Sequence, residues 1–175
     1  MDFLDFEGQD LYFDEPVSSE VAGLIEQAAE VYPDDAAEAY LLRSYFLEPQ
    51  QLTVLVALYR YFYYRHRYQD ALVVAERATA IAGERLGLVG DWSELTAESL
   101  AEAIDASMSL TRFYLLVVKA AGYLELRLGN AEKAAAYLQK VVSLDPRDQF
   151  GAGFLLKLAH SAQLKAAGDN VECLF

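Results

Sequence analysis

A spaced set of small and apolar residues recurs along this chain and limits it to a stack of similar helix pairs. Each copy places residues at a starting position and then four, seven and twelve positions later. The copies are Ala37, Leu41, Ser44 and Pro49; Ala71, Ala75, Ala78 and Gly83; and Ala134, Leu138, Val141 and Pro146. Spacings of three and four put residues on one helix face, and such a recurrence is typical of helical repeats.

The middle of the chain predicts a helical hairpin. Its first segment, Leu55 to Tyr68, is rich in aromatics, and its second, Gln69 to Ala82, is rich in alanine. Bulky residues at helical spacing define one face of the first helix: Leu55, Leu58, Tyr59 and Phe62. Small residues on the second helix allow close approach, so we expect the two faces to pack together.

Eight helices with short connections are predicted, and no segment favours a strand. Ser18 or Ser19 is expected to cap the first helix, and Asp91 to cap the fifth. The expected helices are 18–31, 36–47, 50–68, 69–86, 95–107, 109–128, 131–144 and 148–167. We therefore predict an all-α domain over residues 18–167, preceded by an acidic, aromatic arm (1–17) and followed by a short tail (168–175).

The recurring set resembles the tetratricopeptide repeat family, whose period is about 34 residues. The residues that match that family's pattern best are Gly122, the pair Gly129-Asn130, Ala134, Leu138 and the run Leu144-Asp145-Pro146. The resemblance covers about 18–146 and implies a right-handed superhelix of antiparallel helix pairs with a C-terminal capping helix. The array is irregular, because the step from Ala71 to Ala134 is much longer than the step from Ala37 to Ala71. We interpret the additional residues as the 95–107 helix with its flanking loops.

The charge of the chain is negative and unevenly distributed. Its formal net charge is −13, and 12 of its 27 acidic residues precede the first basic residue, Arg43. Such a field disfavours binding to nucleic acid or to anionic membranes. The start lacks a basic segment followed by an apolar run, and the apolar stretch 110–126 is interrupted by Arg112 and Lys119. We expect a cytoplasmic protein.

No pattern of reactive residues predicts an enzyme. His66 and His160 are the only histidines, and neither begins a spaced set of metal ligands. Cys173 is the single cysteine and lies near the C-terminus. Trp92 is interpreted as a packed residue beside a helix cap rather than as a ligand-stacking one. We expect no cofactor, no metal and no catalytic residue.

The aromatic helix gives the sharpest functional signal. Its tyrosines point all around the helix, so some must face solvent or another protein. In the tetratricopeptide repeat family the first helix of each pair lines a concave groove. That resemblance implies a basic, tyrosine-rich groove lined by Arg60, Tyr63, Tyr64, Lys119, Tyr123 and Arg127. The same residues also fit a core helix with ordinary surface cations.

Three functions fit these residues. The first is an adaptor, scaffold or chaperone-like module that binds an acidic and apolar peptide of a partner in the groove, where tyrosine and arginine suit binding hot spots. The N-terminal arm has the same acidic, aromatic character, so we expect it to compete for the groove. The second is a structural protein that self-associates, as a possible homodimer, through its tyrosines. The third follows from Leu47–Leu72, which is similar to small repeat proteins encoded among bacterial nitrogen-fixation genes: an accessory protein in metalloenzyme assembly.

Overall fold

The computed structural model describes the backbone of residues 16–172 and the side chains of residues 16–166. Within this range the chain is all-helical, with no β-strand, so the predicted all-α class is confirmed. The helices are α1 (Ser19–Val31), α2 (Ala36–Leu47), α3 (Leu52–Tyr64), α4 (Tyr68–Arg85), α5 (Ala97–Ala106), α6 (Met108–Arg127), α7 (Ala131–Leu144) and α8 (Ala152–Glu172), with a 3-10 turn, η1 (Trp92–Glu94). None of the described helices combines the length and apolar character needed to cross a membrane.

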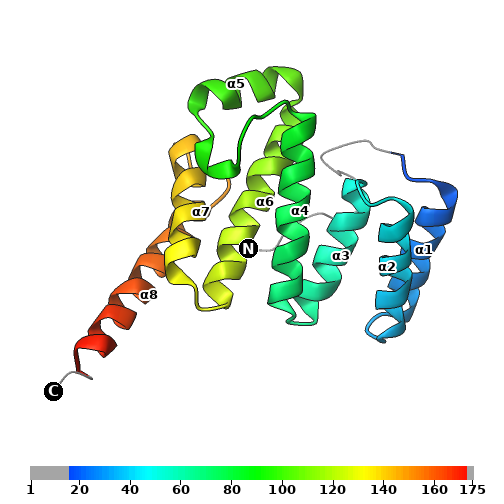
Figure 1. Ribbon diagram of the computed structural model, residues 1–175, viewed down its shortest axis with the longest axis horizontal. Coiled ribbons are helices and arrows are strands. Elements are labelled where there is room, and N and C mark those ends of the chain that lie inside the picture. Colours follow the sequence, from blue (N-terminus) through cyan, green and yellow to red (C-terminus); the bar gives the residue numbers. More distant parts are fainter. Residues whose placement is uncertain (1–15, 173–175) are drawn as a thin grey trace.

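The helices form consecutive antiparallel pairs that lie side by side in chain order (Figure 1). The pairs are α1 with α2, α3 with α4, and α6 with α7, and α8 packs against α7. The second helix of the middle pair, α4, packs directly on the first helix of the next, α6. The superhelical hand and the tetratricopeptide assignment stay predictions.

The α3–α4 hairpin packs as its residue pattern predicts. The predicted face of α3 is buried, with Leu55 1% and Leu58 2% exposed, and the alanines of α4 are buried opposite it. The turn between them differs from the prediction. The helix α3 ends at Tyr64, and Tyr68 begins α4 instead of ending α3.

Two hairpin turns that lie far apart in the sequence share one backbone geometry. His66 has a φ of 57° and Gly129 a φ of 84°, both in the left-handed region that ends many helices. The next amide in each turn bonds back to the end of the preceding helix, from Arg67 N to the Phe62 carbonyl (2.9 Å) and from Asn130 N to the Glu125 carbonyl (2.8 Å). The second and third pairs therefore close in the same way, although only one turn has glycine.

The additional residues between the second and third pairs form a lateral insertion. It contains η1 and α5. The one α-helix on which α5 packs extensively is α6, and α4 and α6 still pack directly on each other. In Figure 1 α5 lies beyond the end of the pairs. The predicted cap was misplaced: Asp91 caps η1 through Ser93 N, whereas Thr96 and Ser99 form the capping box of α5.

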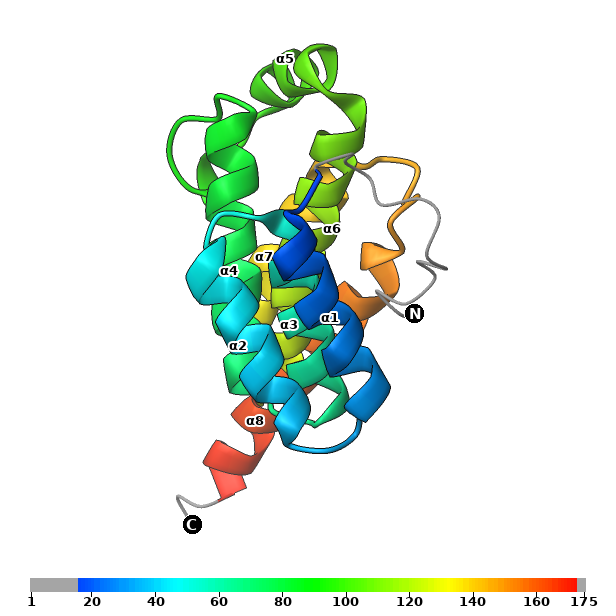
Figure 2. The same cartoon turned by 90° about the vertical axis from the view of Figure 1, so that its right-hand side faces the viewer.

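The last helix covers α7 but keeps an apolar outer side. Ala152, Leu156 and Ala159 are buried, whereas Phe154 and Leu164 are 67% and 75% exposed. The predicted C-terminal helix is thus present, and apolar side chains remain among its exposed residues. It also continues to Glu172, so the predicted boundary at residue 167 lies inside this helix (Figure 2).

Two glycine substitutions are expected to have opposite effects on stability. A Cβ on Gly122 would lie 2.9 Å from Leu138 Cγ and 2.9 Å from Tyr137 Cβ, whereas a Cβ on Gly23 in α1 meets open space. Gly122→Ala should lower the free energy of unfolding by about 1–2 kcal/mol, since overpacking costs about 1–3 and the helix regains up to ~1. Gly23→Ala should raise it by about 0.5–1 kcal/mol. Urea unfolding measures both, and equal effects would contradict the close α6–α7 packing.

Candidate functional site

Three tyrosines and one arginine gather where α3, α4 and α6 meet. The Tyr63 ring stacks on Tyr59, with centroids 5.9 Å apart, and contacts Tyr68 at 6.1 Å. Its hydroxyl lies 3.5 Å from that of Tyr123 on α6. We call Tyr63, Tyr68, Tyr123 and Arg127 the tyrosine cluster. It joins residues of three helices into one polar and aromatic surface.

Arg127 organises the cluster. Its guanidinium donates to the Tyr123 hydroxyl at 2.8 Å and to the Tyr68 hydroxyl, and its Cζ lies 4.4 Å from the centre of the Tyr68 ring. The hydrogen bond to Tyr123 raises the pKa of the guanidinium, so Arg127 stays charged. Tyr68 also accepts or donates a bond with His66 Nδ1 at 2.8 Å. The cluster is therefore held in one geometry and remains at the surface.

Arg60 and Tyr64 line a separate pocket beside the cluster. This joint pocket lies between the first two helix pairs, with a volume of about 340 Å³. Its wall comes from α1, α2 and α3: Ile25, Ala28, Ala29, Tyr32, Leu41, Ala57, Arg60, Tyr61 and Tyr64. Arg60 is exposed and has no ion pair within residues 16–166. An otherwise apolar hollow thus carries one available cation.

Tyr61 adds an unsatisfied polar group to the joint pocket. Its side chain is buried against Tyr32, with an edge-on ring contact at 6.4 Å. Its hydroxyl is buried and has no hydrogen-bond partner in the described residues. Burial, with Glu38 as a lesser cause, raises the pKa of this hydroxyl, so it stays protonated and able to donate. Leaving such a group unpaired costs about 1–3 kcal/mol.

Lys119 does not line a groove as expected. It is 8% exposed, and its Nζ donates to the Phe150 carbonyl at 2.9 Å in the α7–α8 connection. Burial lowers the pKa of the ammonium, and Asp148 opposes that shift. Asp145 accepts from Phe150 N at 2.8 Å, so this residue is held from both sides. Lys119 therefore holds the connection that leads into the last helix, and it does not contribute a cation to the predicted groove.

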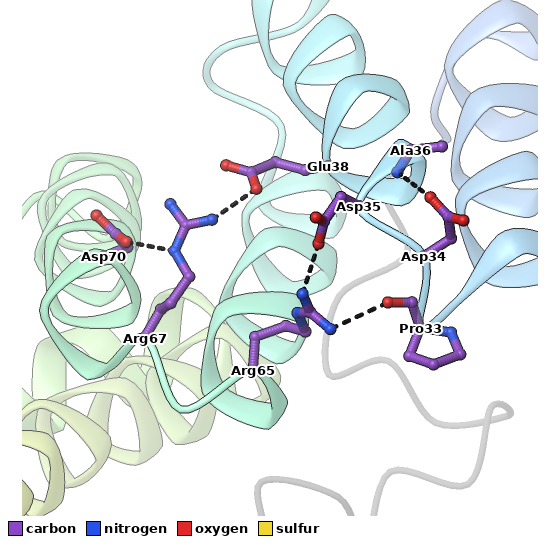
Figure 3. A network of polar contacts seen from close by, with 8 residues as sticks. All are labelled: Pro33, Asp34, Asp35, Ala36, Glu38, Arg65, Arg67 and Asp70. Carbon is purple, nitrogen blue, oxygen red and sulfur yellow. Dashed lines mark hydrogen bonds and ion pairs between the residues drawn. The ribbon is translucent and has the colours of Figure 1, made fainter.

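Ion pairs join the first helix pair to the second (Figure 3). Arg65 bonds Asp35 Oδ1 at 2.5 Å and the Pro33 carbonyl at 3.1 Å. Arg67 bonds Glu38 at 2.5 Å and Asp70 at 2.7 Å. No sequence signal marks the partners of these arginines in the first pair, because these belong to a different hairpin far earlier in the chain.

The sequence is closely similar to that of one known protein. It is 48% identical over 166 residues to an uncharacterized 19.8 kDa protein in the nifW 5′ region of Azotobacter chroococcum mcd 1, and the match covers 94% of this chain and 93% of the relative. The chain belongs to the family of that protein. No protein-family model matches this family member, and no solved structure matches it.

The reactive residues considered in the sequence lie apart in this family member. His66 occupies the α3–α4 turn and His160 lies exposed on α8. The described residues contain no group of three or more His, Cys, Asp or Glu side chains placed to hold a metal ion. Cys173 and the N-terminal arm up to residue 15, including its expected competition for the groove, fall outside the described residues.

Proposed function

We propose that the protein is a tetratricopeptide-like interaction module, of adaptor, scaffold or chaperone-like type, that binds a partner's peptide at the joint pocket and the neighbouring tyrosine cluster. The joint pocket is the observation that carries this proposal. It combines apolar walls, a cation without an ion pair in the described residues, and a buried hydroxyl without a partner there. Pockets of this kind fix a ligand through a few placed polar groups in an apolar surround.

The chemistry of the pocket selects the peptide. Arg60 favours a carboxylate, and the Tyr61 hydroxyl offers a hydrogen bond to a carbonyl or carboxylate oxygen. The walls of alanine, leucine and isoleucine suit an aliphatic or aromatic side chain next to that acid. Beyond the pocket, Tyr63 and Arg127 extend the surface with groups that are enriched at binding hot spots. The ligand is therefore an acidic peptide with an adjacent apolar anchor.

Selection from a random peptide display library tests this function. We expect the recovered peptides to carry Asp or Glu beside a large apolar residue. Calorimetric titration should then show that Arg60→Glu weakens the best peptide by about tenfold or more, because attraction becomes repulsion. Arg77→Glu on α4 is the matched control, since Arg77 is exposed and the charge change is identical. Peptides without this bias, or equal affinities of the two variants, would contradict the proposal.

The relative's genetic position favours a second candidate, an accessory role in nitrogen fixation. The description of that relative places it in the nifW 5′ region. Deleting the gene for this protein should slow growth on dinitrogen and leave growth on ammonium unchanged. Complementation by wild type but not by Arg60→Glu would connect that role to the joint pocket, and equal growth on both nitrogen sources would dismiss it.

Self-association is the third candidate, and α8 favours it more than the tyrosines do. The tyrosine cluster is bonded internally, whereas α8 exposes Phe154, Leu158 and Leu164. Light scattering of wild type and of Leu158→Glu decides this point. A dimer that the substitution dissociates supports self-association, and a wild-type monomer at high concentration excludes it.

A further inference from the structure

A second pocket, separate from the joint pocket, opens between α4, α6, α7 and the connection that precedes α5. Its volume is about 510 Å³, within the usual range of small-ligand sites. We call it the insertion pocket because Leu88, Gly90, Asp91 and Trp92 of the inserted segment form one wall. The other walls are Glu76, Thr79, Ala80, Gly83, Glu84, Tyr114, Ala121 and Tyr137. None of these residues belongs to the tyrosine cluster or to the joint pocket.

Aromatic rings form one side of the insertion pocket. Trp92 stacks on Tyr137, with ring centroids 3.9 Å apart and planes 22° from parallel. The Tyr114 ring lies over Gly83, where a Cβ would approach its Cε2 to 3.1 Å. Glycine at this position thus makes room for the ring at the pocket wall. Trp92 is half-buried, so the indole remains accessible from the pocket.

Carboxylates give the insertion pocket its charge. Glu76, Glu84 and Asp91 all line it, and none has an ion pair within residues 16–166. Asp91 uses Oδ1 to accept the Ser93 amide at 2.6 Å. Burial, with the charge of Asp91, raises the pKa of Tyr114 to about 12, and burial with Glu76 raises the pKa of Tyr137 to about 12. Both tyrosines stay neutral, so the three carboxylates give the pocket a net negative charge.

Tyr114 brings a further polar group to the wall of the insertion pocket. Its side chain is only 3% exposed, and it still reaches the pocket wall. Its hydroxyl has no hydrogen-bond partner among the described residues. A ligand N–H that entered the pocket could donate a hydrogen bond to the Tyr114 oxygen.

We propose that the insertion pocket binds an alkylammonium group, carried either by a lysine side chain of a partner or by a free polyamine. The carboxylates attract the charge, the Trp92 and Tyr137 rings provide cation–π contacts, and Tyr114 accepts a hydrogen bond. An anion would be repelled. A metal ion lacks a ligand set, since no group of three or more His, Cys, Asp or Glu residues converges in the described part of the chain.

The single tryptophan of the chain, Trp92, reports binding directly. We would titrate the full-length protein with Nα-acetyl-lysine N-methylamide, with the norleucine analogue that lacks only the amine, and with spermidine. Fluorescence of Trp92 should change saturably with lysine amide and spermidine, and not with the norleucine compound. Spermidine binding tighter than lysine amide by about tenfold or more identifies a free polyamine as the source. Closer affinities identify a lysine side chain.

Matched variants separate this pocket from the general negative charge of the protein. Glu76→Gln with Glu84→Gln should weaken lysine amide by about fivefold or more, because it removes two local charges. Glu98→Gln with Glu102→Gln on the exposed face of α5 removes the same charge elsewhere and should have little effect. Tyr114→Phe should also weaken binding while Trp92 fluorescence without ligand is unchanged.

Three results would overturn the proposal: a response to norleucine amide equal to that of lysine amide, equal weakening by the two glutamine pairs, or no saturable response to either cation at tens of millimolar. None of these three results depends on whether a peptide binds at Arg60. The two pockets therefore succeed or fail separately.

Discussion

Ala134→Arg is expected to lower the melting temperature by about 10 °C or more, or to prevent folding. Ala134 is 0% exposed on α7, which packs against both α6 and α8. An arginine there overpacks the contact and buries a charge without a partner, a combination that costs about 3–5 kcal/mol. In a chain of this size each kcal/mol shifts the melting temperature by about 2–4 °C.

The control for this substitution lies two positions further along the same helix. Ala136 is exposed, so Ala136→Arg introduces the same side chain with the same helix propensity at a solvated position. Thermal unfolding followed by circular dichroism should give a change of no more than about 2 °C for Ala136→Arg. Equal, small shifts for both variants would show that α7 is not packed at Ala134 and would remove the basis of the repeat assignment.

Lys119→Glu should destabilise the protein almost as strongly. The substitution replaces an ammonium that donates to the Phe150 carbonyl with a carboxylate facing that oxygen. It also adds negative charge beside Asp145 and Asp148 in the same connection. Reversing a buried, hydrogen-bonded charge costs about 3–5 kcal/mol. Hydrogen exchange should show the loss first in α8, because the Phe150 peptide leads into that helix.

Lys157→Glu is the matched control, since Lys157 is exposed on α8 and the charge change is identical. Its free energy of unfolding should stay within about 0.5 kcal/mol of the wild-type value. Retention of α8 protection in Lys119→Glu would mean that Lys119 is a surface cation after all. In that case it would return to the groove that the sequence predicts.

Most of the helices follow from local pattern, because capping and helical periodicity act over a few residues. Ser18 accepts the Val21 amide as predicted for a cap, and the faces of α3 and α4 are buried as predicted. The left-handed turn at His66 is harder to see, since a glycine would signal it and none is present. Its equivalence to Gly129 is visible only through the repeat spacing.

The candidate site was harder to predict, because it depends on how helices approach one another. Lys119, Tyr123 and Arg127 follow one another at intervals of four on α6 and share a helix face. The α7–α8 connection covers the first of them through Phe150, whereas the other two remain at the surface. Which part of that face is covered depends on the path of a connection beyond the next helix. No local pattern contains that information.

The insertion pocket was missed for a related reason. Trp92 was expected to be packed, and it is, against Tyr137. The surrounding Glu76, Glu84 and Tyr114 belong to two different helices, and the inserted segment closes one side of the space between them. Their spacing in sequence matches no known ligand pattern, so only the three-dimensional arrangement shows that they share a cavity.

The joint pocket lies at the least extensive contact between successive helix pairs. The first pair touches α3 far less than α4 touches α6, and exposed ion pairs of Arg65 and Arg67 supplement that contact. Because each stacked pair is stabilised mainly by its contacts with neighbouring pairs, we expect local unfolding to begin at this contact. A ligand bound there would either separate α1 and α2 from α3 or hold them against it. It would thereby change how often this first helix pair detaches from the rest of the molecule.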